Sequence, residues 1–179
     1  MGIPLSDEIR RQLDRPNFGH LATIMPDGSP HSAPVWIARE GDLVLICTEA
    51  TSLKGKNTER DPRIALSIVD FYDPYTELQM RGRVTERRPD PQLKYYDLMS
   101  QKYIGKPWPY RDEKSPIVLM IEIVKAKYSS FPSSTLHRFV SPDFKEKGRD
   151  AGVHRSGPSC PGESLVIFTD CPDTQKIPT

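Results

Sequence analysis

The stretch T-E-A-T-S-L-K-G-K-N-T-E-R-D-P-R, residues 48–63, decides how the chain is organised. It follows the apolar run L-V-L-I (residues 43–46), which predicts a buried strand, and it ends in Asp61-Pro62, where proline favours the end of a helix. Thr51 or Ser52 is a suitable N-cap, because a side-chain hydroxyl accepts a hydrogen bond from the first helical turn. The stretch therefore predicts a strand that leads into a short polar helix.

The start of this helix has the chemistry of a phosphate site. Free backbone N–H groups and the positive end of the helix dipole point to one place there. Thr51, Ser52 and Lys54 stand at that end, and Lys56 and Arg60 follow along the helix. The alternative is a solvated amphipathic helix whose lysines are ordinary surface residues.

Six segments rich in apolar and β-branched residues predict strands with mostly short connections. The turn signals P-D-G and E-G-D separate the first three, as in an antiparallel meander. Gly82, inside the fifth segment, indicates a bulge or a close approach of two backbones. A mainly β fold follows, a closed six-stranded antiparallel barrel with short helices. The six predicted strands are residues 18–25, 30–38, 43–48, 64–71, 76–86 and 117–124, the last extending toward 131.

Two further short helices are expected, at residues 6–15 and 90–103, the first capped by Ser6. The composition changes after residue 131. Residues 132–179 are rich in Pro, Gly, Ser and charge, and only residues 165–169 could form a short strand. We therefore expect one domain over residues 1–131, followed by a largely disordered tail.

Composition excludes several classes of function. The formal net charge of +1 over 179 residues gives no argument for nucleic acid or a membrane surface, and no apolar run is long enough for a membrane span. The three cysteines lack the spacing of a zinc site, so no metal is expected. Cys47 lies in an apolar strand, where a buried free thiol is usual. A reduced, cytoplasmic setting follows.

Three segments together resemble one family. They are G-H-L-A-T-I-M-P-D-G-S-P-H-S-A-P-V-W-I (residues 19–37), S-L-K-G-K-N-T-E-R-D-P-R-I-A-L-S-I (52–68) and L-Q-M-R-G-R-V-T-E (78–86). In this order and spacing they are similar to the pyridoxamine 5'-phosphate oxidase-like split β-barrels, over residues 9–131. The form of residues 54–63, with Pro34-Val35-Trp36, is most similar to the branch that uses the deazaflavin coenzyme F420. Other members of the superfamily bind FMN, haem or tetrapyrroles.

The resemblance implies a homodimer with two cofactor sites at the subunit interface. Ser52, Lys54 and Lys56 would hold the cofactor phosphate, and Lys56 and Arg60 could meet the acidic tail of F420. An apolar substrate pocket would include Tyr75 and Trp108, the latter in a Pro-rich loop that could act as a mobile lid. The full set of implied cofactor contacts is Val35 and Trp36 through their backbone, Thr48, Ser52, Lys54, Lys56, Asn57 as a support, and Gln79 from the partner subunit.

The expected activity is that of an oxidoreductase that uses reduced F420 for hydride transfer to a small organic electrophile. The alternatives are an FMN-dependent oxidase or reductase of the same fold, or a non-catalytic flavin-, haem- or tetrapyrrole-binding protein. No catalytic residue is assigned, because the sequence has no Ser-His-Asp, Cys-His or paired-carboxylate pattern and the cofactor would bring the chemistry. Oxidation of pyridoxamine 5'-phosphate itself is not expected. The Arg-x-x-x-Lys pairing before the helix and the Arg-x-His near the C-terminus are both missing.

Overall fold

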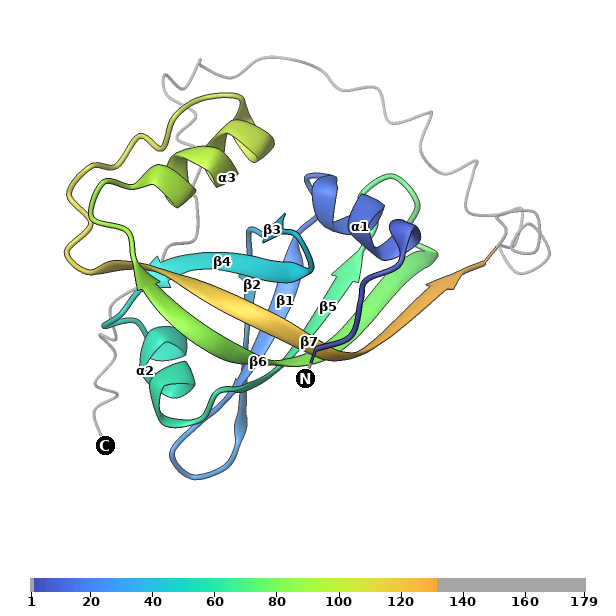
Figure 1. The fold of residues 1–179 in the computed structure, drawn as a ribbon, viewed down its shortest axis with the longest axis horizontal. Helices are drawn as coiled ribbons and strands as arrows, with labels where there is room; N and C mark the ends of the chain where they lie inside the picture. Colours follow the sequence, from blue (N-terminus) through green and yellow to red (C-terminus); the bar gives the residue numbers. More distant parts are fainter. Residues whose placement is uncertain (1, 132–179) are drawn as a thin grey trace, which may run out of the picture. The chain divides into compact units, whose positions relative to one another are not determined.

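The computed structural model describes residues 2–131. Alternating burial marks most strands: in β5, Ile64, Leu66 and Ile68 point inward while their neighbours point outward. Three short helices join seven strands (Figure 1). The elements are α1 (Asp7–Asp14), β1 (Gly19–Ile24), β2 (Pro30–Val35), β3 (Ala38–Glu40), β4 (Leu43–Glu49), α2 (Leu53–Arg60), β5 (Arg63–Val69), β6 (Thr76–Pro89), α3 (Lys94–Ile104) and β7 (Pro116–Ser130).

All seven strands belong to one antiparallel sheet of order β2-β1-β5-β6-β7-β4-β3. The two edge strands, β2 and β3, are consecutive in the chain, so the sheet curls until its edges meet again at Trp36 and Ile37. Side chains from strands of both halves, such as Leu66 and Ile46, share one core. This is a barrel split between β2 and β3, and the predicted mainly β split-barrel class is confirmed.

The strand count is seven rather than six, because the segment predicted as one strand over residues 30–38 is interrupted. Trp36 and Ile37 leave the ladder, and β3 resumes at Ala38 on the opposite edge of the sheet. Alternation of apolar side chains cannot reveal this break, since Val35 and Ile37 are both buried, as they would be in a continuous strand.

The long strands β6 and β7 run side by side through both halves of the barrel (Figure 1). Their pairing shifts by one residue between Arg81 and Gly82. A Cβ at Gly82 would lie 2.5 Å from the carbonyl oxygen of Glu122, closer than a side chain tolerates. The sequence-based expectation of a bulge and a close backbone approach at Gly82 is confirmed.

The helices lie where the sequence places them. Ser6 caps α1, and Ile9 and Leu13 are buried. α1 lies beside the starts of β1 and β4, whereas α2 lies beside their ends (Figure 1). α3 begins four residues later than expected, at Lys94, because the Asp90 carboxylate accepts from the first backbone N–H groups. It covers the outer side of β4, so that strand is buried on both faces.

The predicted tail and the predicted strand at 165–169 lie outside the described residues. In residues 2–131, no helix combines the length and apolar character needed to cross a membrane. Within the same range, no group of His, Cys, Asp or Glu side chains is arranged to hold a metal ion.

Asp70 anchors the loop between β5 and β6 to α1. Its buried carboxylate accepts from the backbone N of Tyr72 and Asp73, from Gln12 Nε2 at 3.0 Å, and from Arg15. Burial alone would raise the pKa of Asp70, but these hydrogen bonds outweigh it and lower the pKa. The ionised form therefore stabilises the fold.

Replacing Asp70 with Asn should destabilise the protein by roughly 1–3 kcal/mol at neutral pH, because several donors lose a charged acceptor. A lowered folded-state pKa gives stability that is present above about pH 4 and lost as the pH falls through that pKa. Chemical denaturation at several pH values should therefore show the gap between parent and variant narrowing in acid. The control is Asp42→Asn, which removes an exposed ion pair with Arg10 and should cost about 1 kcal/mol or less. A gap independent of pH would contradict this account of Asp70.

Candidate functional site

Hydroxyl groups lock the connection between β4 and α2. Ser52 is the N-cap of α2: its Oγ accepts from the backbone N of Gly55 at 3.1 Å and donates to the carbonyl of Glu49 at 2.8 Å. Thr48 Oγ1 lies 2.8 Å from Ser52 Oγ. Because the single proton of Ser52 goes to Glu49, Thr48 is the donor in that pair. The predicted cap is confirmed at Ser52, and both hydroxyl protons are used within the protein.

Two residues hold α2 tightly against the barrel. A Cβ at Gly55 would lie 2.3 Å from the carbonyl oxygen of Glu49, so only glycine allows this helix to sit so close to the end of β4. Asn57 is buried, and its Nδ2 donates to Thr23 Oγ1 at 3.0 Å. Asn57 therefore ties α2 to β1 through its side chain. The start of α2 is a rigid feature of the fold.

Positive charge gathers along this helix. Lys54, at its second position, is half-buried, and Lys56 is exposed. The first turn itself holds no acidic residue, although the Glu49 carboxylate, just before the helix, accepts from Thr51 Oγ1 at 3.4 Å. Arg60 donates to the carbonyl of Ile24 and is committed to the fold. The combination of helix-start amides and a lysine suits an oxygen-rich anion such as a phosphate.

Aromatic side chains fill the space between the barrel and α3. The indole of Trp36 stacks on Tyr103, with ring centres 4.8 Å apart and planes 3° from parallel. Its other neighbour is Trp108, whose ring lies edge-on at 5.7 Å. Tyr96 packs against Trp108 from α3. These rings fix the chain where β2 ends and β3 begins.

The interpretation of Trp108 as a mobile lid is corrected by this packing. Trp108 is only 5% exposed, its backbone N donates to Asp97 at 2.8 Å, and its indole N donates to Glu113 at 3.2 Å. A Pro-rich sequence predicts a loop, but it does not predict how firmly one aromatic residue anchors that loop. Tyr75, the other predicted pocket residue, is 40% exposed in the connection between β5 and β6.

The predicted cofactor contacts are not all gathered in one place. Val35 is buried in the core of the barrel. Gln79 lies on the outer face of β6, between its register partners Ser67 and Lys127. Lys54 lies instead at the end of the barrel with α2, which packs on β1 and β4. Within one protomer, the predicted contacts around α2 form one cluster and the aromatic residues around Trp36 form another.

Buried titratable groups near the aromatic cluster have structural roles. Burial raises the pKa of Tyr103 to about 12 and lowers the pKa of Lys102 to about 8. Both side chains are hydrogen-bonded to backbone, Lys102 Nζ to the carbonyl of Ile37 at 2.8 Å and Tyr103 to that of Asn17 at 2.5 Å. Burial also raises the pKa of Cys47 well above its usual value, so this free cysteine remains a thiol.

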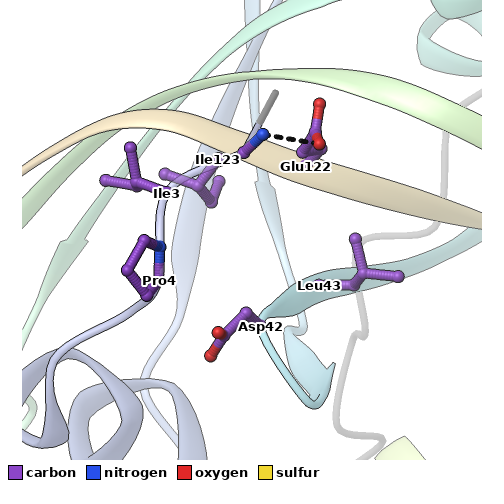
Figure 2. A pocket seen from close by; sticks show the side chains of 7 residues that line it. Ile3, Pro4, Asp42, Leu43, Glu122 and Ile123 are labelled. Carbon is purple, nitrogen blue, oxygen red and sulfur yellow. Dashed lines mark hydrogen bonds between the residues drawn. The ribbon is translucent and has the colours of Figure 1, made fainter.

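Residues of α2 line neither of two hollows in the described part of the chain. One, of about 270 Å³, lies under the N-terminal segment (Figure 2), where the backbone N of Gly2 donates to Glu122 at 2.6 Å. The other, of about 540 Å³, lies on the outer face of the sheet and includes Gln79 and Arg81. The sequence pattern indicates a role for Gln79 but none for the cations beside it, Arg81 on the same strand and Lys125 and Lys127 on β7.

Sequence reasoning also missed two residues on which the site depends. Gly55 could have been found from the sequence, because a glycine inside a helix lowers its stability and so indicates that close packing requires it. Tyr103, which stacks on Trp36, carried none, because its contact joins segments more than sixty residues apart.

A family model described as pyridoxamine 5'-phosphate oxidase matches residues 5–129. The chain belongs to this family. The match covers the whole barrel, including the start of α2 and the outer face of β6. No curated protein sequence matches significantly.

Solved structures agree with membership of the pyridoxamine 5'-phosphate oxidase family. An F420 reductase is 28% identical, with 69% of this chain and 98% of that chain covered and a TM-score of 0.64. A conserved hypothetical protein from Mycobacterium tuberculosis is 25% identical, covering 72% and 86% of the two chains, with a TM-score of 0.58. General Stress Protein 26 from Bacillus anthracis, at 18% identity, 69% and 92% coverage and a TM-score of 0.54, shares the fold.

Replacing Ser52 with Ala should destabilise the protein by about 1 kcal/mol, since the N-cap acceptor for Gly55 is lost. Thermal unfolding without any ligand measures this. Thr51→Ala is the matched control, because its exposed hydroxyl makes only contacts of 3.4 Å and should change the melting temperature little. Equal melting temperatures for both variants would show that Ser52 does not stabilise α2.

Proposed function

We propose that this chain is an oxidoreductase that uses reduced coenzyme F420 for hydride transfer to a small organic electrophile. The observation that carries the proposal is the start of α2, where a capped helix presents Lys54 with no acidic residue in its first turn. The similarity to an F420 reductase, at 28% identity over 69% of this chain, supports the same cofactor.

The residues of α2 would hold the cofactor phosphate. Lys54 supplies a positive charge at the second helical position, and the helix dipole adds to it. Thr48 donates to Ser52, and Ser52 donates to the carbonyl of Glu49, so neither hydroxyl proton is available to a ligand. In this arrangement the hydroxyls fix the helix start, and Lys54 makes the charged contact. Lys56 lies two residues further along the helix and is exposed, so it would meet the solvated part of the ligand.

The backbone at Val35 and Trp36 would meet the edge of the ring system. When bound, a deazaflavin supplies the hydride chemistry itself. The chain contributes a rigid edge: Trp36 is stacked on Tyr103, and the Tyr103 hydroxyl accepts from the backbone N of Ile37 at 3.0 Å. A fixed edge holds a bound ring in one orientation and limits the entropy lost when the substrate approaches.

FMN is the second candidate, because it also carries a phosphate that the start of α2 could hold. Absorbance titration of the purified protein with F420, FMN and haemin separates these ligands from the non-catalytic alternative. A turnover assay with the ligand that binds follows. We expect F420 to bind with the highest affinity. Binding of haemin alone, without turnover, would contradict the proposed activity.

Replacing Lys54 with Ala should weaken F420 binding about tenfold to a hundredfold, the equivalent of roughly 1.5–3 kcal/mol for a charge-assisted hydrogen bond. Lys56→Ala is the matched control on the same helix and should cost about 1 kcal/mol or less, since exposed ion pairs contribute little. Thermal unfolding of both ligand-free variants checks that α2 remains folded.

Salt gives an independent measure of the same contact. The affinity for F420 should fall with ionic strength more steeply than the affinity for riboflavin, which has no phosphate. If Lys54→Ala binds F420 and FMN as tightly as the parent, α2 is a solvated surface helix and the proposal loses its main support.

We further propose that the active form is a homodimer. Gln79 lies on the outer face of β6 and α2 lies at the end of the barrel, so a second copy is needed to bring Gln79 to the helix. A symmetric dimer would create two such sites at once. Light scattering at micromolar protein should therefore give twice the chain mass of 20.3 kDa. A monomer under these conditions would remove the basis for a shared site.

A further inference from the structure

A pair of carboxyl groups connects two parts of the candidate site. Glu113 lies in the Trp108 loop (residues 105–115, between α3 and β7), and Glu49 is the last residue of β4. Both side chains are half-buried, and they lie within hydrogen-bonding distance of each other. Two carboxylates this close repel each other, so the contact is a hydrogen bond only when the pair holds a proton.

Backbone contacts bring the two carboxyl groups together. The carbonyl of Ser115 accepts from the backbone N of Ala50 at 2.8 Å, so the end of the Trp108 loop is bonded to the turn before α2. Glu49 Oε1 accepts from the backbone N of Lys114 at 3.1 Å. The residue that follows Glu113 is therefore bonded directly to Glu49. The fold itself, rather than any attraction between the carboxyl groups, places them side by side.

Glu113 also contacts the aromatic cluster. Its Oε1 accepts from the indole N of Trp108 at 3.2 Å. Trp108 in turn lies edge-on to Trp36, with ring centres 5.7 Å apart. The carboxyl pair thus lies between the turn before α2 and the rings around Trp36, which are the two clusters of the candidate site. A change in the charge of the pair acts on both clusters.

The surroundings of Glu113 favour its protonated form. Burial and the hydrogen bond with Glu49 raise the pKa of Glu113 above its ordinary value, and the charges of Glu49 and Asp112 act in the same direction. The hydrogen bond from Trp108 lowers this pKa but is outweighed. The pair therefore keeps a proton to a higher pH than an isolated glutamate would.

Other ionisable groups surround the pair. Burial is the main reason that the pKa of Tyr96 on α3 is raised, and its phenol stays neutral. In the Trp108 loop, Arg111 is paired with Asp97 at 2.7 Å. The remaining groups are a buried thiol on β4, a carboxylate bonded to the start of α3, an exposed lysine in the loop and the first cation of α2, namely Cys47, Asp90, Lys114 and Lys54. Because the phenol and the thiol stay neutral, the proton that is lost here as the pH rises comes from the carboxyl pair.

We propose that Glu49 and Glu113 form a pH-sensitive latch between the Trp108 loop and the turn before α2. When the pair holds a proton, one carboxyl group donates to the other and ties the loop to the turn. When that proton leaves, two negative charges face each other, and the attachment of the loop weakens. The latch is part of the fold and does not depend on the proposed cofactor.

The test compares the full chain, without ligand, with its Glu113→Gln variant. Glutamine is neutral at every pH, its amide can donate to Glu49, and its carbonyl can accept from Trp108, so it imitates the closed latch. A raised folded-state pKa gives stability that is present at low pH and lost as the pH rises through that pKa. The two proteins should therefore melt at the same temperature at about pH 4. At about pH 8 the melting temperature of Glu113→Gln should be higher by about 2 °C or more.

Tryptophan emission gives a second and local measurement. The chain has two tryptophans, Trp36 and Trp108, and both lie in the cluster that Glu113 contacts. The emission of the parent should change with pH in one step, centred above the ordinary pKa of a glutamate. The step should be absent from Glu113→Gln. It should also be absent from Glu49→Gln, which removes the other charge and serves as the second variant.

Asp112→Asn is the matched control, because it removes an exposed neighbouring carboxylate and leaves the hydrogen bond of the pair intact. Its emission step should persist and move to slightly lower pH, since one repelling charge is lost. An undiminished step in both glutamine variants would overturn the latch. A melting temperature of Glu113→Gln below that of the parent at about pH 8 would overturn it as well, because the ionised pair would then stabilise the fold.

Discussion

The ladder between β6 and β7 is the constraint on which both halves of the barrel depend. β6 pairs with β5 on one side, β7 pairs with β4 on the other, and the two long strands join these halves. The ribbon must bend to close the barrel, and the shift of register at Gly82 allows it. One backbone feature thus sets the curvature that lets both halves share one core.

Local patterns predicted most of the strands and all three helices. In β5 and β6 one face is buried, so apolar side chains alternate clearly. In β4 both faces are buried, under the core and under α3, so its apolar run is nearly continuous. What could not be predicted depends on distant contacts: the break at Trp36 is stabilised by Tyr103, and Trp108 is buried by residues of α3.

The candidate site divides in the same way. The cap at Ser52 and the charge at Lys54 follow from adjacent residues, so the sequence predicted the helix start correctly. The hollow on the outer face of the sheet depends on register, since Arg81 and Lys125 become neighbours only when β6 and β7 pair. A single sequence contains both cations but not their alignment. A site built from adjacent residues can therefore be predicted from one sequence, whereas a site built across paired strands cannot.

The gap between β2 and β3 is closed by side chains instead of a backbone ladder. The backbone N of Ile37 donates to the Tyr103 hydroxyl at 3.0 Å, and its carbonyl accepts from Lys102 Nζ at 2.8 Å. Two consecutive residues of α3 therefore do for Ile37 what a neighbouring strand does elsewhere. Amide hydrogen exchange at Ile37 consequently reports the docking of α3, even though the residue lies between two strands. The connection between β2 and β3 should therefore open together with α3, as one cooperative unit.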